Sequence, residues 1–546
     1  MCIPKIHITM LFGILVIGTV LRIYGLGAKS IWFDEAVTAS YLDFSPIAIV
    51  HRCAEVRAVH PPLYFVFIRC WTALAGNSEI ALRGPSVVFG LATILGVYAL
   101  IRELSCFPRS LPVTPPASTA LLAALLVALS PMQIELSRTA RGYTMATAFL
   151  SYGGWALVRA LQDRRRYGSW TAAALLAAAA CYTHYMTVLS VAANGLFAIV
   201  FIAWRWTSAC NARRFPSEGA ESLESDLRGP LFALGLFTAV YLIPWFPKLL
   251  PQSETVRHSI VWPITKERAL DQVRHAVYSS YDVQWTTDPF SLWIVTILLG
   301  SLFTYLACRG GWRRWYLVAA GLLPPLVLAV YSLRTDHSIF HARYLCFAQL
   351  AWLGGTAVVV SDIPIREIRA FFMVELAALS ACACYDNWFL INTSAQPGMR
   401  AATRFILDHR TTGEPIVAQT PYVFFGLKYY ARGTDRPLLC VHVLRRQVQY
   451  GSEQLHDEEL VTPEQLALVD QSGIWLVTSD SYNPSLIVTP PIPDRWERVG
   501  SWSFDQDRWL ERPIQVVHYR IRRNTSRPPR STHRVSYEGQ ISPLQM

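Results

Sequence analysis

Two adjacent carboxylates, Asp34 and Glu35, are the residues of this sequence with the clearest capacity for chemistry. They follow an aromatic approach, Ile31-Trp32-Phe33, in the first extended loop after an apolar segment. A carboxylate can accept the proton of an attacking hydroxyl, so Asp34 is the candidate general base. Glu35 is a candidate to orient the acceptor or to bind a cation. Taken alone, such a pair also fits a solvated charged turn after an anchoring helix.

Cationic side chains at later turns form a second group that suits an anionic leaving group. Arg138 and Arg141 are three residues apart, with Tyr143 nearby, and Arg343 follows much later in the chain. Guanidinium groups bind phosphate oxygens through charge-assisted hydrogen bonds and stabilise negative charge that develops on them. These four residues are the candidate phosphate-binding group. The alternative for each arginine is snorkelling toward lipid head groups.

Two histidines and a tyrosine complete the candidate site as substrate-binding residues. His60 precedes two prolines, which disfavour a helix before them and present the imidazole in an extended turn. His60 and Glu35 are also the candidate ligands of a divalent metal, although no ligand spacing identifies one. His184, at the end of an apolar segment, binds substrate or packs as a hydrogen-bonded histidine. Tyr344 joins the substrate group.

The elements that must position these residues are membrane-spanning helices. The chain has 546 residues, 52% of them hydrophobic and 16% charged, and a mean hydropathy of +0.28, which excludes an ordinary soluble enzyme. A helix of about 20 apolar residues crosses the hydrocarbon core of a bilayer. The pattern predicts about eleven spans, near residues 7–27, 84–102, 117–134, 143–161, 169–185, 186–204, 229–249, 289–307, 315–333, 343–361 and 370–391.

Alternation of the spans predicts which loops share one face of the membrane. Five polar regions fall on one face: the loop of Asp34 and His60, the turn of Arg138 and Arg141, the His184 turn, residues 250–288 and the turn before Arg343. Compact Arg-rich turns on the opposite side predict that this side is cytoplasmic. The loop of 250–288 is expected to stack on a sugar or to lie along the interface through its aromatic residues, Trp262, Tyr278, Tyr281 and Trp285.

The composition changes after about residue 392, where long apolar runs end. Short strand-like runs at 415–418, 473–477 and 514–519 alternate with helical stretches such as 463–470, which predicts a small soluble α/β domain. We therefore expect a polytopic α-helical membrane domain over 1–391, an extracytoplasmic α/β domain over 392–522 and a disordered tail over 523–546.

Several motifs occur in an order typical of one family. Ile31 to Ala36 is followed by His60-Pro61-Pro62-Leu63-Tyr64, and the remaining motifs are Leu82 to Ser86, Ser137 to Tyr143, Tyr182-Thr183-His184-Tyr185 and Ala342-Arg343-Tyr344-Leu345. Together they resemble bacterial relatives of protein O-mannosyltransferases and aminoarabinose transferases, which are GT-C glycosyltransferases of the family 39 type. By this resemblance, Arg141 is the stronger phosphate candidate.

The resemblance implies a GT-C fold and an inverting transfer of a hexosyl or pentosyl group from a polyprenyl-phosphate donor to an acceptor hydroxyl. The acceptor is a lipid, a glycan or a protein, and no cofactor is certain beyond the open divalent metal. The expected location is the bacterial cytoplasmic membrane, with the active site on its extracytoplasmic face. The net charge of +11 suits lipid head groups and phosphate, and no nucleic-acid module is recognisable. The rival interpretations are a multi-spanning transporter or lipid flippase and a non-catalytic membrane scaffold.

Overall fold

The computed structural model describes most of the chain in two compact units. Its described residues are 5–56, 58–105, 116–163, 166–212, 217–259, 265–278, 289–335, 338–385, 398–434, 436–441, 454–467, 473–479, 487–490, 492, 496–506 and 513–521. The membrane unit comprises Met1–Ala28 and Tyr41–Ser394, and the C-terminal unit comprises Lys29–Ser40 and Ala395–Met546. The domain boundaries at 391 and 522 stay predictions, and the predicted tail over 523–546 lies outside the described residues. The sequence did not predict that the short segment Lys29–Ser40 belongs to the C-terminal unit rather than to the membrane unit.

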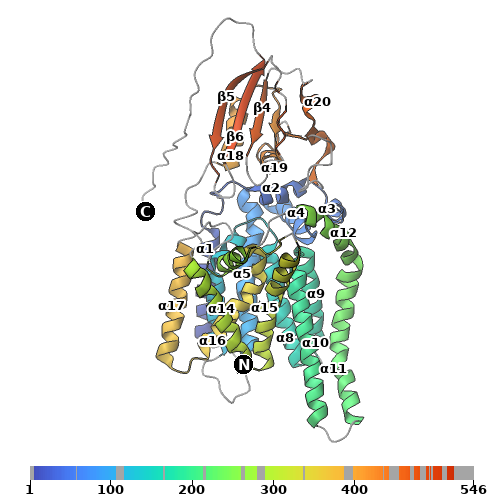
Figure 1. Ribbon diagram of the computed structural model, residues 1–546, viewed down its shortest axis with the longest axis vertical. Helices are drawn as coiled ribbons and strands as arrows, with labels where there is room; N and C mark the ends of the chain where they lie inside the picture. Colours follow the sequence, from blue (N-terminus) through green and yellow to red (C-terminus); the bar gives the residue numbers. More distant parts are fainter. Residues whose placement is uncertain are drawn as a thin grey trace. The chain divides into compact units, whose positions relative to one another are not determined.

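The membrane unit is built from helices alone over its described residues. In Figure 1, α8 to α11 run alongside one another, and each contacts its neighbours. The elements are α1 (Lys5–Ile23), η1 (Tyr41–Asp43), α3 (Pro46–Cys53), α4 (Leu63–Ala75), α5 (Glu79–Leu104), α6 (Pro116–Leu129), α7 (Pro131–Ser137), α8 (Tyr143–Gln162), α9 (Tyr167–Thr183), α10 (Thr187–Ala212), α11 (Ser217–Phe237), η2 (Thr238–Leu242), α12 (Ile243–Ser259), α13 (Lys266–Tyr278), α14 (Pro289–Arg309), α15 (Trp312–Arg334), α16 (Ala342–Ser361) and α17 (Arg366–Tyr385).

Within the described part of the chain, seven helices are long and apolar enough to cross a membrane, or eight if α6 and α7, bent by 61°, form one broken span. The predicted count of eleven is therefore not confirmed, although a helix lies at every predicted position. Three predicted spans, at α8, α9 and α14, are not among these helices, and each has a separate reason. α9 has only 17 residues, and α14 has a described apolar stretch of only Ile294–Arg309. α8 is largely buried among other helices and carries Thr, Ser, Gly and Tyr, which a lipid-facing helix would replace with apolar residues.

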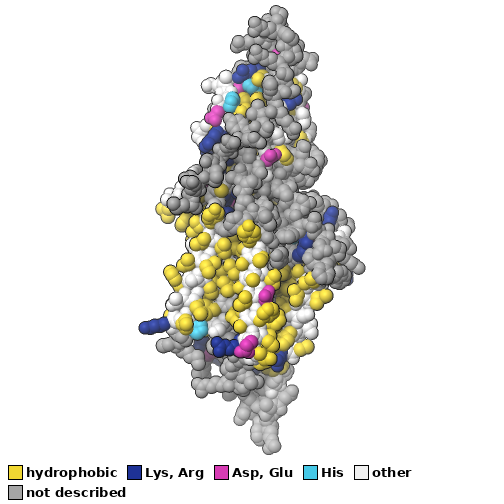
Figure 2. All heavy atoms as spheres, turned by 90° about the vertical axis from the view of Figure 1, so that its left-hand side faces the viewer, with side chains coloured by type: hydrophobic (Ala, Val, Ile, Leu, Met, Phe, Trp, Pro, Cys, Tyr) yellow, Lys and Arg dark blue, Asp and Glu magenta, His cyan; other side chains and the backbone are white. Residues whose placement is uncertain are grey.

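One face of the membrane unit, over α17, is largely apolar. Figure 2 faces the side on which α17 lies in Figure 1 and shows hydrophobic side chains gathered there with few charges between them. On α17, Phe371, Val374 and Leu379 are more than half exposed, and Phe12 on α1 is 67% exposed. Apolar surface of this extent is stable against lipid and costly in water. The protein is therefore a multi-pass membrane protein.

Opposite ends of the long helices carry different polar groups. α16 begins beside Arg343, and its 20 residues span about 30 Å. Asp362 follows its far end and pairs with Arg314 at 2.7 Å between Oδ2 and Nη2. α8 likewise begins at a candidate site residue, and Asp163 and Arg166 pair at 3.0 Å beyond its last residue. Candidate site residues and Arg-containing turns thus lie at opposite ends of the same helices, as the alternation of spans predicted.

A buried arginine joins α1 to α6 and α7. Arg22 is fully buried, and its guanidinium donates to Ser137 Oγ and Ala128 O, both at 3.1 Å, and to Val127 O at 3.3 Å. We expect Arg22→Met to lower the free energy of unfolding by about 1–3 kcal/mol, because buried acceptors lose a charged donor. The thermal midpoint in detergent checks this. Lys5→Met, at an exposed site on α1, is the control, and equal midpoints for the two variants would contradict the prediction.

The C-terminal unit is a mixed α/β domain, as predicted. Its six described strands have the order β3-β2-β1-β4-β6-β5, parallel from β3 to β4 and antiparallel at β6 and β5. The elements are α2 (Phe33–Ser40), α18 (Gly398–His409), β1 (Ile416–Ala418), α19 (Pro421–Tyr430), β2 (Leu438–Cys440), η5 (Asp457–Glu459), β3 (Leu460–Val461), α20 (Pro463–Ala467), β4 (Gly473–Thr478), β5 (Trp496–Phe504) and β6 (Ile514–Ile521).

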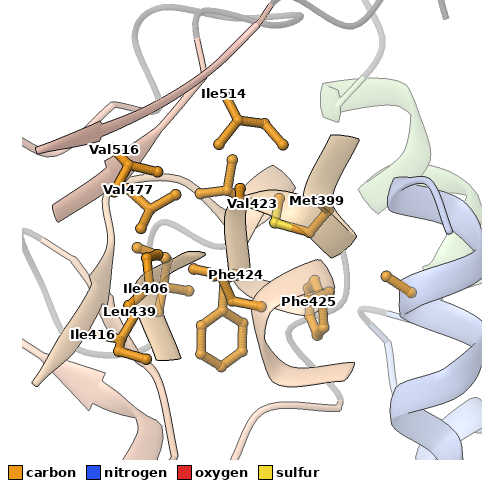
Figure 3. Packing of buried hydrophobic residues seen from close by; sticks show 14 of the residues in the cluster. Met399, Ile406, Ile416, Val423, Phe424, Phe425, Leu439, Val477, Ile514 and Val516 are labelled. Atoms are coloured by element: carbon orange, nitrogen blue, oxygen red, sulfur yellow. The ribbon is translucent and has the colours of Figure 1, made fainter. Parts of the chain in front are cut away.

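Alternate strand residues bury two faces of the sheet. Ile416 and Ala418 belong to one core, whereas Val417 belongs to the other, as the two-residue period of a strand requires. Figure 3 shows the first core, in which Val423, Phe424 and Phe425 from α19 and Met399 from α18 lie beside strand side chains. The same core includes buried residues of the segment Lys29–Ser40. This segment is therefore part of the α/β domain rather than a connector.

Candidate functional site

The carboxylate pair lies at the start of α2, and its two members have different surroundings. Glu35 is 1% exposed, and its Oε2 accepts from the backbone N–H of Trp32 at 3.4 Å. This contact is half of a capping box, in which a side chain three residues on bonds the residue before the helix. Asp34 is only partly buried. The structure thus gives Glu35 a helix-capping contact and leaves Asp34 as the carboxylate accessible to a reactant.

In the membrane unit, His60 and Arg141 form a direct pair. His60 Nε2 lies 2.7 Å from Arg141 Nη2, although 81 residues separate them. An arginine side chain only donates hydrogen bonds, so His60 Nε2 must accept and its ring proton must lie on Nδ1. Burial, followed by the charge of Arg141 and the nearby His184 and Arg343, lowers the pKa of His60 well below its usual 6.5. His60 is therefore neutral at physiological pH and holds Arg141 without cancelling its charge.

A ring of aromatic side chains surrounds His184, the C-cap residue that follows α9. Its ring centroid lies 4.8 Å from that of Tyr143, 5.3 Å from Phe347, 5.7 Å from Tyr344 and 6.4 Å from His60. These side chains come from α8, α9, α16 and the turn before α4. Four residues predicted from separate motifs are thus brought together at one end of the helix bundle.

Arg343 extends the cationic group from the start of α16. Its guanidinium carbon lies 5.2 Å from the ring centroid of Tyr344, and its backbone N–H donates to His341 Nδ1 at 3.4 Å. Burial and the charges of Arg343 and His275 lower the pKa of His341 well below 6.5. The first turns of α8 and α16 add partial positive charge from their backbone N–H groups. His60, Arg141, Tyr143, His184, Arg343 and Tyr344 are hereafter the cationic cluster.

Arg138 takes a different position. Its guanidinium donates to Tyr24 O at 2.6 Å and, over longer distances, to Gly25 O and Leu21 O. These carbonyls lie at the C-terminal end of α1, where backbone acceptors lack helical partners. The described contacts thus show Arg138 capping α1, and it is Arg141 that pairs with His60.

The loop of 250–288 contributes a helix that is tied to α16. Gln272 Oε1 on α13 accepts from the backbone N–H of Ala342 at 2.8 Å, and Gln349 donates to Ala276 O. Asp271, also on α13, pairs with Arg274 at 2.6 Å. The expected sugar-stacking aromatics of this loop lie outside the residues whose side chains are described. Sequence reasoning missed His341, which directly precedes the Arg343 motif, and Phe347, which follows Arg343 by four residues at helical spacing.

The metal prediction stays a prediction. Among the residues that the structure describes, no group of three or more His, Cys, Asp or Glu side chains is placed to hold a metal ion. The two candidate ligands, Glu35 and His60, belong to different units, and His60 Nε2 is already bonded to Arg141.

Comparison with known proteins agrees with this architecture. Residues 59–212 match the family model of dolichyl-phosphate-mannose-protein mannosyltransferases. ArnT from Cupriavidus metallidurans in the apo state is 11% identical, with 94% of this chain and 97% of ArnT covered at a TM-score of 0.53. The structure of ArnT bound to undecaprenyl phosphate is 12% identical, with 93% and 97% covered at a TM-score of 0.52. A search of curated proteins found no match.

The archaeal oligosaccharyltransferase AglB from Archaeoglobus fulgidus is 12% identical at a TM-score of 0.44, which is too low to support an inference. The match covers 78% of this chain, and this chain spans 63% of the AglB chain. The likeness to ArnT shows that this multi-pass protein has the GT-C fold. The family match and this fold confirm the predicted resemblance to GT-C glycosyltransferases of the family 39 type.

Proposed function

We propose that this protein transfers a sugar from a polyprenyl-phosphate donor to an acceptor hydroxyl, with inversion at the anomeric carbon. The observation that carries the proposal is the cationic cluster, in which the buried Arg141 is held by a neutral histidine beside Arg343. A partly buried cluster of this sign suits an anion, and its place at the helix ends suits a phosphate at the membrane surface. The family match and the ArnT complex with undecaprenyl phosphate support this donor class.

The proposed reaction assigns a separate task to each group. The bond between the anomeric carbon and the phosphate oxygen breaks, and both of its electrons leave with the phosphate. Arg141 and Arg343 stabilise this developing charge. The acceptor oxygen bonds to the opposite face of the anomeric carbon, which inverts its configuration. Asp34 takes the proton of the acceptor hydroxyl, and His184 and Tyr344 contact the donor.

We also propose that the cationic cluster and the α/β domain act on the extracytoplasmic side of a bacterial cytoplasmic membrane. The other helix ends carry arginines, such as Arg314 in the first turn of α15 and Arg166 between α8 and α9, as the positive-inside rule expects near cytoplasmic loops. A lipid flippase is less well supported, because transporters usually place their polar site near the bilayer midplane within broken helices. The cationic cluster instead lies where α8 and α16 begin and α9 ends.

The test supplies the purified protein with radiolabelled polyprenyl-phosphate hexoses and pentoses and with extracted lipid, glycan and protein acceptors. We expect label to move to one acceptor class and free polyprenyl phosphate to be released in equal amount. Movement of intact donor across vesicles without release of polyprenyl phosphate would overturn the proposal in favour of a flippase. Parallel reactions with EDTA test whether a divalent metal takes part. If it does, EDTA should abolish sugar transfer, and added Mg²⁺ or Mn²⁺ should restore it.

A further inference from the structure

The segment that carries Asp34 is integrated into the C-terminal α/β domain, although residues 41–394 separate the two in sequence. We propose that this domain positions the general base, with Tyr430 and Arg432 at the end of α19 acting as positioning residues. The inference rests on the proposed function, because it takes Asp34 to be the base. It also assigns the domain a task in the chemical step, beyond any part in choosing the acceptor.

Apolar packing supplies the first attachment. Ile31, Ala36 and Val37 are each less than 8% exposed and belong to the same core as α18, α19 and the inner face of the sheet. The ring of Phe33 meets Tyr422 edge-on at 4.7 Å between centroids and lies 6.1 Å from Phe425. A helix of eight residues is too short to be stable alone, so α2 depends on this packing.

Hydrogen bonds to the backbone of the segment supply the second attachment. Tyr430 Oη accepts from the N–H of Ile31 at 2.8 Å, two residues before the start of α2. At the other end of α2, Arg432 Nη2 donates to Ala39 O at 2.7 Å. Arg400 donates to Lys29 O at 3.1 Å where the segment begins. Contacts of this kind define the path of the backbone at both ends of α2, whatever side chains the helix bears.

The segment and the domain also approach each other closely at a glycine. Gly398, the first residue of α18, has φ +51°, and a Cβ on it would clash with Ser30 Oγ. Its backbone N–H donates to Asp505 O at 2.9 Å, so it cannot move away without losing that bond. Gly398 of the domain therefore packs directly against the side chain of Ser30 in the segment.

This attachment determines which carboxylate is presented. The inward face of α2 bears Ala36 and Val37, and Glu35 is buried as the cap of the helix. Asp34 remains partly accessible on a helix held at both ends. A general base must lie within hydrogen-bond reach of its proton, and a misplacement of about 1 Å can cost about a hundredfold in rate. Loosening either end of α2 should therefore slow the chemical step more than donor binding.

The experiment compares Tyr430→Phe and Arg432→Gln with Tyr429→Phe, which removes a hydroxyl from the neighbouring tyrosine. We expect the first two variants to lower kcat for transfer by about tenfold with an unchanged KM for the donor. Hydrogen exchange at 29–40 should become faster in both, while Tyr429→Phe resembles the wild type. In an Asp34→Asn background, Tyr430→Phe should have almost no further effect, because a base that is absent cannot be misplaced.

Three results would count against the proposal in distinguishable ways. Unchanged exchange at 29–40 in both variants would show that Tyr430 and Arg432 do not hold the segment. Faster exchange with an unchanged kcat, or an equal loss in the Asp34→Asn background, would show that the attachment is structural only. A wild-type protein that transfers no sugar from any donor would overturn the proposed function itself, while the exchange result would still decide the attachment.

Discussion

Arg141→Ala should lower kcat/KM for sugar transfer by about a hundredfold to a thousandfold, which is typical of losing one preorganised donor to a developing negative charge. The effect is large because Arg141 is only 6% exposed and is oriented by His60 at 2.7 Å, so water cannot easily replace it. Arg141→Lys should recover part of the activity, because lysine keeps the charge but loses the second N–H group of a bidentate contact. Initial rates with labelled donor check both expectations.

The matched control for Arg141 is Arg166→Ala. Arg166 is an exposed arginine that pairs with Asp163 in the turn beyond the other end of α8. Its loss should leave the rate of sugar transfer within about twofold of the wild-type rate, because exposed ion pairs contribute little to stability. Equal rates for Arg141→Ala and the wild type, with both proteins folded, would show that the phosphate binds elsewhere.

Asp34→Asn should lower kcat by about a hundredfold to ten-thousandfold, the usual contribution of a general base. The substitution preserves size and leaves the capping contact of Glu35 intact, so α2 should remain in place. Donor binding should be unchanged, because Asp34 is assigned to the acceptor proton. Single-turnover rates with saturating donor separate this loss from a loss of affinity.

Two controls distinguish a base from a merely structural carboxylate. Asp43→Asn removes an exposed acid soon after α2 and should leave kcat unchanged. Glu35→Ala should chiefly lower the thermal midpoint, because it removes the buried side chain that accepts the N–H of Trp32 at the start of α2. If Asp34→Asn transferred sugar as fast as the wild type, the base would have to be another group.

The positions of the helices followed from local pattern, because a long apolar run has few stable alternatives to a spanning helix. The number of spans did not follow in the same way. α8 is shielded from lipid by neighbouring helices, and it carries polar residues that would be unfavourable if the helix faced lipid. The strands near 416, 474 and 515 were also predictable, since short β-branched runs between turns indicate strands.

The candidate residues could be named from their chemistry and order, and the shared helix end of Arg141, His184 and Arg343 followed from alternation of the spans. Local pattern carries no information about which distant residues touch, because periodicity reports only the face that a residue lies on. Tertiary structure alone showed that Arg141 bonds His60 while Arg138 caps α1. It also showed that Ile31 bonds Tyr430, 399 residues away, so that the Asp34 segment is part of the α/β domain.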